Sequence, residues 1–173
     1  MKLFLLTLSL FIYLIVSGQT DKTRILTEFR HTQEIVESGK FRIDIHIATP
    51  LNGMNIAVDS AWIAIDGEKA CGYLPYYSSG YSFPRLGAKG INFDNMPFNK
   101  SLKIKGRNDK KSLKYSFGIV GKNDIYRIQM DIQYDGRCYI YITSNNHSPI
   151  SYVGDIIKSN RSDYCLLYTS PSP

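Results

Sequence analysis

The sequence predicts a single, mainly β domain, built as an antiparallel sandwich or a small lipocalin-like barrel, with one short N-terminal helix. Two observations support the β class: apolar and polar residues alternate in several short segments from Phe41 onward, and Asp-Gly pairs separate such segments. Alternation with a period of two is typical of strands with one buried face, and Asp-Gly is typical of hairpin turns. We expect this β domain to cover residues 41–164.

Residues 1–18 have the features of a secretory signal peptide. Lys2 supplies a positive charge, and Leu3 to Val16 form an apolar run that is short for a membrane span. The small residues Ser17 and Gly18 stand where a signal peptidase requires them. The alternative is a membrane anchor, but no cysteine stands near the cleavage region to accept a lipid. We therefore expect cleavage before Gln19, no stable membrane span afterwards, and a periplasmic or secreted protein.

The last nine residues, Cys165 to Pro173, resemble a translated sequencing adapter, so we leave residues 165–173 out of the predicted domain. Cys71 and Cys138 are then the cysteines that remain. In an oxidising compartment they could form one disulfide, and the alternative is that both are small buried hydrophobic residues.

Within residues 19–40, the segment from Thr27 to Gly39 has apolar spacing typical of a helix, and Gly39 can end it. A strand follows to Pro50, with its apolar side made by Phe41, Ile43, Ile45 and Ile47. Further strands are expected at Ala61–Ile65 and Lys69–Leu74, which flank Asp66-Gly67, around Leu102 and Ile104, and from Leu113 to Ile119.

The Asp135-Gly136 turn allows a prediction of strand register. A two-residue loop would place Ile132 opposite Tyr139, whereas a three-residue loop with a left-handed Gly136 pairs Ile132 with Cys138. The second register also pairs Met130 with Ile140 and Ile128 with Ile142, so that all six apolar residues share one face. We expect that register, with the polar face formed by Arg127, Gln129, Asp131, Tyr139 and Tyr141.

Three motifs of the chain, taken in their order, are similar to those of a known bacterial family. These motifs are Leu74-Pro75-Tyr76-Tyr77, the Asp135-Gly136 hairpin, and Ile150-Ser151-Tyr152-Val153-Gly154. The chain resembles domain-of-unknown-function family 4251 from the predicted helix to Asp155. The resemblance implies a Gram-negative protein with a secretory or lipoprotein signal and no assigned activity. This chain differs from the lipoprotein members because it has no lipobox cysteine.

The sequence predicts no catalytic residues, no metal site and no cofactor. It contains no His-Glu-x-x-His, phosphate-binding loop, dinucleotide-binding fingerprint or Gly-x-Ser-x-Gly motif. A nucleophilic pair of Cys138 with His46 or His147 is conceivable, but we favour satisfied or exposed histidines. Asp44 and His46 share a strand face, yet two ligands without a third indicate a surface pair.

Two groups of residues are candidates for ligand binding. The first is an aromatic group in and beside the loop after Leu74, consisting of Tyr73, Tyr76, Tyr77, Tyr81 and Phe83. Such rings can stack on sugars or apolar ligands, or instead cover the open end of the domain. The second is a basic strand with Lys103, Lys105 and Arg107 on one side, which could meet an anionic polymer or lipid, or instead protect a sheet edge.

The sequence therefore predicts a non-enzymatic binding or envelope-accessory module. The chain carries a formal net charge of +6, and its expected secretion favours a glycan, a lipid or an envelope protein over nucleic acid as its partner. The alternatives are a hydrolase that acts on an extracellular polymer and a protein-interaction or inhibitor module. A histidine and a carboxylate meeting in a pocket would favour the hydrolase, and an open aromatic groove would favour the binding module. Neither the ligand nor the oligomeric state follows from the sequence.

Overall fold

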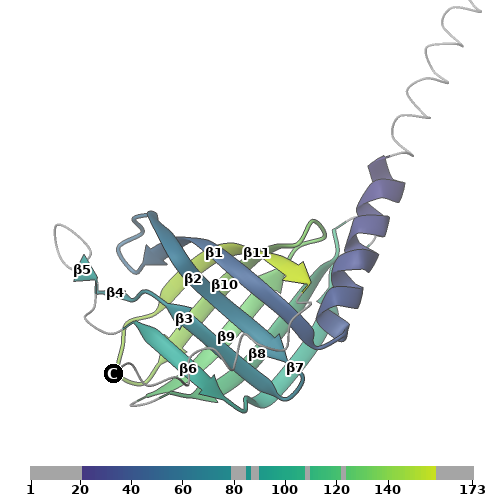
Figure 1. The fold of residues 1–173 in the computed structure, drawn as a ribbon. Helices are drawn as coiled ribbons and strands as arrows, with labels where there is room; N and C mark the ends of the chain where they lie inside the picture. The colour runs from purple at the N-terminus through teal and green to yellow at the C-terminus, as the bar shows by residue number, and fades with distance from the viewer. Residues whose placement is uncertain (1–20, 79–84, 87–89, 108–109, 122–123, 159–173) are drawn as a thin grey trace, which may run out of the picture.

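The protein folds as one curled antiparallel sheet with a helix at one end, as the computed structural model shows (Figure 1). The structure describes residues 21–78, 85–86, 90–107, 110–121 and 124–158. The predicted signal peptide 1–18, Tyr81, Phe83 and the tail 165–173 lie outside the described residues.

The main sheet has nine strands in the order β6-β3-β2-β1-β11-β10-β9-β8-β7. Their bounds are β1 Lys40–Pro50, β2 Ile56–Asp66, β3 Lys69–Leu74, β6 Ile91–Asn95, β7 Phe98–Lys105, β8 Ser112–Val120, β9 Ile125–Ile132, β10 Arg137–Ser144 and β11 Ile150–Lys158. Two further short strands, β4 (Tyr77–Ser78) and β5 (Arg85–Leu86), pair with each other. All described strand pairs are antiparallel, which confirms the predicted fold class.

The sheet is curled into a half-barrel, so the two layers of a sandwich are not formed (Figure 1). Its edge strands are β6 and β7, and these are joined by Met96 and Pro97 alone. Asn95 Nδ2 at the end of β6 also donates to the carbonyl oxygen of Val120 in β8, at 3.5 Å. The chain therefore passes directly from one edge of the sheet to the other, which requires the sheet to be curled.

The N-terminal helix is described from residue 21 and continues to residue 37. It ends where the sequence predicts, because Gly39 has a φ of +66° and its N–H donates to the carbonyl of Val36. Phe29, Ile35 and Val36 belong to the hydrophobic core. Thr32 Oγ1 donates to the Tyr134 carbonyl at 3.0 Å, which ties the helix to the turn between β9 and β10. The helix thus covers one end of the half-barrel.

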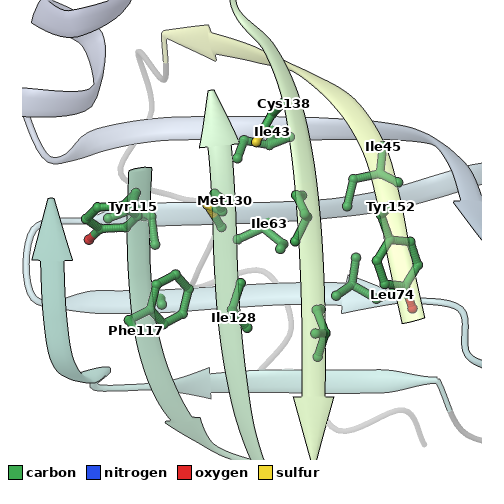
Figure 2. Close-up of a cluster of buried hydrophobic side chains, with 14 of the residues drawn as sticks. Ile43, Ile45, Ile63, Leu74, Tyr115, Phe117, Ile128, Met130, Cys138 and Tyr152 are labelled. Carbon is green, nitrogen blue, oxygen red and sulfur yellow. The ribbon is translucent and has the colours of Figure 1, made fainter. Parts of the chain in front are cut away.

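The hydrophobic core occupies the inner face of the sheet (Figure 2). The β9–β10 hairpin has the predicted register, with Cys138 opposite Ile132, Ile140 opposite Met130 and Ile142 opposite Ile128. All six side chains are buried in the core, and Gly136 has a φ of +86°. The three-residue turn is therefore confirmed, together with the outward position of Tyr139 and Tyr141.

The predicted alternation of β1 fails after Ile45. A register shift between Ile45 and Ile47 leaves His46 without a partner across the strand pair, which is the sign of a β-bulge. The extra residue reverses the faces, so that Ala48 and Pro50 are buried while Ile47 is only half-buried. The prediction that Ile47 continues the apolar side of the strand was therefore wrong.

The structure excludes one of the two alternatives for the cysteines and confirms the side of the strand predicted for Leu102 and Ile104. Cys138 is a free, buried cysteine in the inner core, whereas Cys71 packs with Ala64 on the outer face of the sheet, so the Cys71–Cys138 disulfide is not formed. Leu102 and Ile104 do face inward, opposite Tyr115 and Leu113, but they stay 38% and 50% exposed because β7 is an edge strand.

Candidate functional site

The described part of the aromatic loop does not form an exposed aromatic surface. Tyr76 is buried in the core, and its hydroxyl donates to the Ser148 carbonyl oxygen at 3.2 Å. Tyr77 is partly buried against the same core. Tyr73 lies on the outer face of β3, opposite Trp62, and so does not share a surface with Tyr76. These positions favour the alternative in which the rings hold the loop over the end of the barrel.

A different pair of tyrosines stands exposed on the outer face of the sheet. Tyr139 and Tyr141 occupy successive outward positions of β10 and are 47% and 43% exposed. They line a hollow of about 310 Å³. We call its outward-facing residues the tyrosine platform: Lys114, Gln129, Asp131, Tyr139, Tyr141, Ser151 and Val153.

Strand register arranges the tyrosine platform in two rows across the sheet. In the first row, Lys114 is opposite Asp131, Asp131 is opposite Tyr139, and Tyr139 is opposite Val153. In the second row, Gln129 is opposite Tyr141, which is opposite Ser151. Each ring therefore has at least one hydrogen-bonding side chain directly beside it.

A second hollow, of about 340 Å³, continues this outer face toward the end of the sheet. Its lining includes Arg127 and Thr143, which lie two positions from Gln129 and Tyr141 on the same strands. It also includes Phe98, which is 39% exposed. The Phe98 ring covers Gly118, where an added Cβ would lie 2.4 Å from the ring. Together, the two hollows make an extended surface with an aromatic side chain at each.

The predicted basic strand lies at the edge of this surface. Lys103 and Lys105 are exposed on β7, and Lys103 is directly opposite Lys114 of the tyrosine platform. Arg107 is also exposed, but it lies beyond the end of β7, so its predicted place on the same strand was wrong. Lys114 in turn forms an ion pair with Asp131. Burial and, to a smaller extent, the charge of Lys105 lower the pKa of Lys114. The structure therefore brings together the basic strand and the tyrosine platform, which the sequence did not connect.

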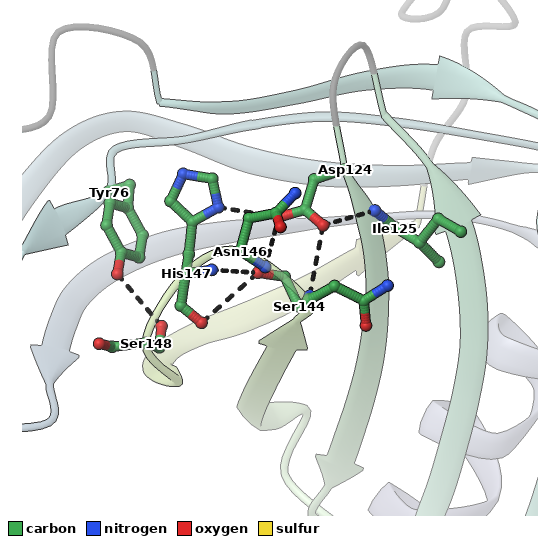
Figure 3. A network of polar contacts seen from close by, with 8 residues as sticks. Tyr76, Asp124, Ile125, Ser144, Asn146, His147 and Ser148 are labelled. Atoms are coloured by element: carbon green, nitrogen blue, oxygen red, sulfur yellow. Dashed lines mark hydrogen bonds and ion pairs between the residues drawn. The ribbon is translucent and has the colours of Figure 1, made fainter.

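A buried carboxylate and a histidine meet at the end of the sheet opposite the helix (Figure 3). The side chain of Asp124 is 1% exposed, and its Oδ2 lies 2.8 Å from Nδ1 of His147. Asp124 also accepts hydrogen bonds from the backbone N–H groups of Ile125, Asn145 and Asn146, at 2.8, 3.3 and 3.4 Å. The His147 ring stands 5.0 Å from the ring of Tyr76.

Burial alone would raise the pKa of Asp124. The hydrogen bonds from His147, Ser144 and the backbone outweigh that effect and hold the pKa below its usual value. Asp124 is therefore a fixed negative charge that organises the loop of residues 144–148. The sequence did not predict this site, because Asp124 lies 23 residues from His147.

The Asp124–His147 pair resembles half of a catalytic triad, since the carboxylate fixes one ring nitrogen and leaves the other for proton transfer. The hydroxyl of Ser144 makes hydrogen bonds within the same loop: its oxygen accepts from the backbone N–H of His147 at 2.9 Å, and it donates to the His147 carbonyl oxygen at 3.5 Å. No group of three His, Cys, Asp or Glu side chains that could hold a metal occurs among the residues the structure describes. His46 instead pairs with Asp155, at 3.3 Å.

Cys138 is expected to be unreactive in the folded protein. It is fully buried, and burial together with the negative charge of Asp155 raises the pKa of its thiol, so little nucleophilic thiolate forms. Iodoacetamide should leave Cys138 unmodified in the native protein and modify it after unfolding in urea, as measured by peptide mass spectrometry. Modification of the native protein at this position would reopen the cysteine–histidine mechanism.

Comparison with known proteins supports the fold and adds no activity. No curated protein matches the chain. A solved structure of a DUF4251 family protein from Bacteroides eggerthii DSM 20697 is 15% identical, with a TM-score of 0.64 over 79% of this chain and 91% of that chain. Within the described residues, no helix has the length and apolar character to cross a membrane. The family model for DUF4251, a domain of unknown function, matches residues 24–156, and the chain therefore belongs to this family.

Proposed function

We propose that this protein is a secreted, non-enzymatic binding module that holds a glycan on its tyrosine platform. The observation that carries the proposal is the pair of exposed rings, Tyr139 and Tyr141, lining a hollow among polar side chains. A tyrosine ring offers an apolar face for stacking on a sugar ring, and its hydroxyl tolerates a wet site. The rest of the domain acts as a rigid scaffold for this surface.

The spacing of the two rings suits a chain of sugars. Residues two apart on a strand stand on the same face, about 7 Å from each other. Gln129, Asp131 and Ser151 flank the rings through the strand register and can hydrogen-bond to sugar hydroxyls. A lipid would be better served by an enclosed apolar cavity, whereas these hollows are open on the outer face of the sheet and include charged and amide side chains among their lining.

The proposed location, in the periplasm or outside a Gram-negative cell, rests on the signal-like sequence of residues 1–18. Export would bring the tyrosine platform into contact with envelope and extracellular polysaccharides. The hydrolase alternative is supported by the Asp124–His147 pair. Asp124, directly before β9, makes these hydrogen bonds to the loop of residues 144–148, which contains His147, and so we assign the pair a structural role.

The proposal is tested by thermal unfolding of the purified protein with soluble neutral and acidic polysaccharides. A ligand that binds only the folded state raises the melting temperature. We expect at least one polysaccharide to do so, and we expect Tyr139→Thr combined with Tyr141→Thr to abolish the increase. Threonine keeps the strand preference while removing both rings, so the unliganded melting temperature should change little.

Tyr73→Thr serves as the matched control, because Tyr73 is also on the outer face but lies on β3, away from both hollows. It should retain the ligand-induced increase in melting temperature. If Tyr73→Thr removes the increase while the double variant keeps it, the ligand binds beside the aromatic loop and the tyrosine platform is not the site. No increase with any polysaccharide would contradict the glycan proposal.

A further inference from the structure

Two lysines adjoin Lys114 of the tyrosine platform on the outer face of the sheet. Lys103 is opposite Lys114 in the β7–β8 pair, and Lys105 follows Lys103 by two positions on the same face. Because Lys114 lines the hollow beside Tyr139, its neighbours Lys103 and Lys105 extend the same surface toward the edge of the sheet. The first row of the tyrosine platform therefore begins with a cluster of positive charge.

This arrangement works against the stability of the sheet. Like charges directly opposite each other on neighbouring strands repel, and the pair Lys103–Lys114 has this geometry. Asp131 offsets only one of the three charges, through its ion pair with Lys114. Lys103 and Lys105 have no acidic partner among the described residues. A cluster of unneutralised charge next to an aromatic hollow is suited to an anionic ligand.

We propose that the glycan bound at the tyrosine platform is anionic, with its acidic groups held by Lys103, Lys105 and Lys114. This inference rests on the proposed function. Neighbouring strands lie about 4.8 Å apart, so the row from Lys103 on β7 to Tyr139 on β10 spans about 14 Å. One sugar unit does not reach across that distance. The ligand is therefore an acidic oligosaccharide that stacks on the tyrosines and carries carboxylate or sulfate groups further along its chain.

The test compares anionic polymers with neutral polymers of the same backbone. The probes are oligomers of polygalacturonate and its carboxyl-reduced form, and a sulfated galactan and its desulfated form, each titrated by calorimetry. We expect tighter binding of at least one anionic form, weakening as salt is added. Lys103→Gln combined with Lys105→Gln should weaken that binding by about tenfold and leave the neutral form unaffected. Which anionic polymer binds distinguishes carboxylate from sulfate recognition.

A charge-matched control separates a local site from general attraction. Lys69→Gln with Lys158→Gln removes the same charge from two exposed lysines outside both hollows. Equal weakening by this control would overturn the inference, because overall charge would then explain the binding. Failure of every anionic polymer to bind more tightly than its neutral form would overturn it as well. In that case, loss of neutral-polymer binding in the double tyrosine variant would show that the proposed function still holds.

The competing explanation is that these lysines only protect the β7 edge from pairing with other chains. It predicts that the double lysine variant self-associates while its monomer binds the anionic polymer as tightly as the original protein does. Light scattering at the concentrations used for the titrations checks this, and that combination of results would contradict the proposed role in binding.

Discussion

Replacing Gly154 with alanine is expected to destabilise the protein by about 3 kcal/mol or more, enough to reduce its soluble yield. Gly154 lies at the centre of the sheet, between Ile45 of β1 and Cys138 of β10. A Cβ there would stand 2.2 Å from the carbonyl oxygen of Asp44. Because the clashing atom belongs to the backbone of β1 and not to a flexible side chain, the clash is relieved only if β1 and β11 separate. Thermal and urea unfolding measure the effect.

Val153→Ala is the matched control, since Val153 is the adjacent residue but is half-buried on the outer face. Its loss should be below about 1.5 kcal/mol, as is usual for a small apolar truncation. If Gly154→Ala unfolds at nearly the same temperature as the original protein, the bulge at His46 absorbs the added methyl group and the close approach of the strands has no energetic importance.

Replacing Asp124 with alanine is expected to cost about 2–4 kcal/mol. The substitution removes a buried hydrogen-bond acceptor. The backbone N–H groups of Ile125, Asn145 and Asn146 then lose their partner, as does the ring of His147. The loop of residues 144–148 should loosen, and with it the contact between Tyr76 and the Ser148 carbonyl. Urea unfolding measures the cost. As a control, Asp94→Ala removes an exposed carboxylate from β6 and should change stability by less than about 0.5 kcal/mol.

The same carboxylate sets an acid dependence of stability. The pKa of Asp124 is lowered in the folded protein, so its ionised form stabilises the fold above the unfolded value of about 3.9, and this contribution is lost as the pH falls through the folded value. Stability should therefore decrease below about pH 4 more steeply in the original protein than in Asp124→Asn. Equally steep decreases in the two proteins would assign the acid sensitivity to other carboxylates.

The sequence was most informative where periodicity and turn chemistry agreed. In the β9–β10 hairpin, the position of Asp135-Gly136 between two alternating segments left one register that buried all six apolar residues, and the structure has it. The inserted residue at His46 could not be foreseen, because nothing in the alternating sequence marks a bulge. It turned Ile47 away from the core and moved Ala48 into it.

The candidate site was predicted only in part. The basic strand was identified from its alternation of lysines with Leu102 and Ile104, but its neighbours depend on the strand order, which the sequence did not supply. Tyr139 and Tyr141 were correctly assigned to the outer face, yet nothing marked them as a surface of their own until register placed Lys114 and Gln129 beside them. Tyr76 was predicted as a binding residue because its loop is rich in aromatic residues, and its burial reflects the tertiary position of that loop.

The pairing of β1 with β11 bears on how the protein folds. These strands lie side by side in the middle of the sheet, although nearly the whole domain separates them along the chain. On one side of this pair β2 follows β1, and on the other side β7 to β11 follow one another in chain order, so much of the sheet can grow by local hairpins. The β1–β11 pair forms only once β11, the last strand, is present, and contacts between residues so far apart in sequence slow folding. Without β11, the edges of β1 and β10 that it joins would stay unpaired. We therefore expect a chain lacking β11 to aggregate rather than fold.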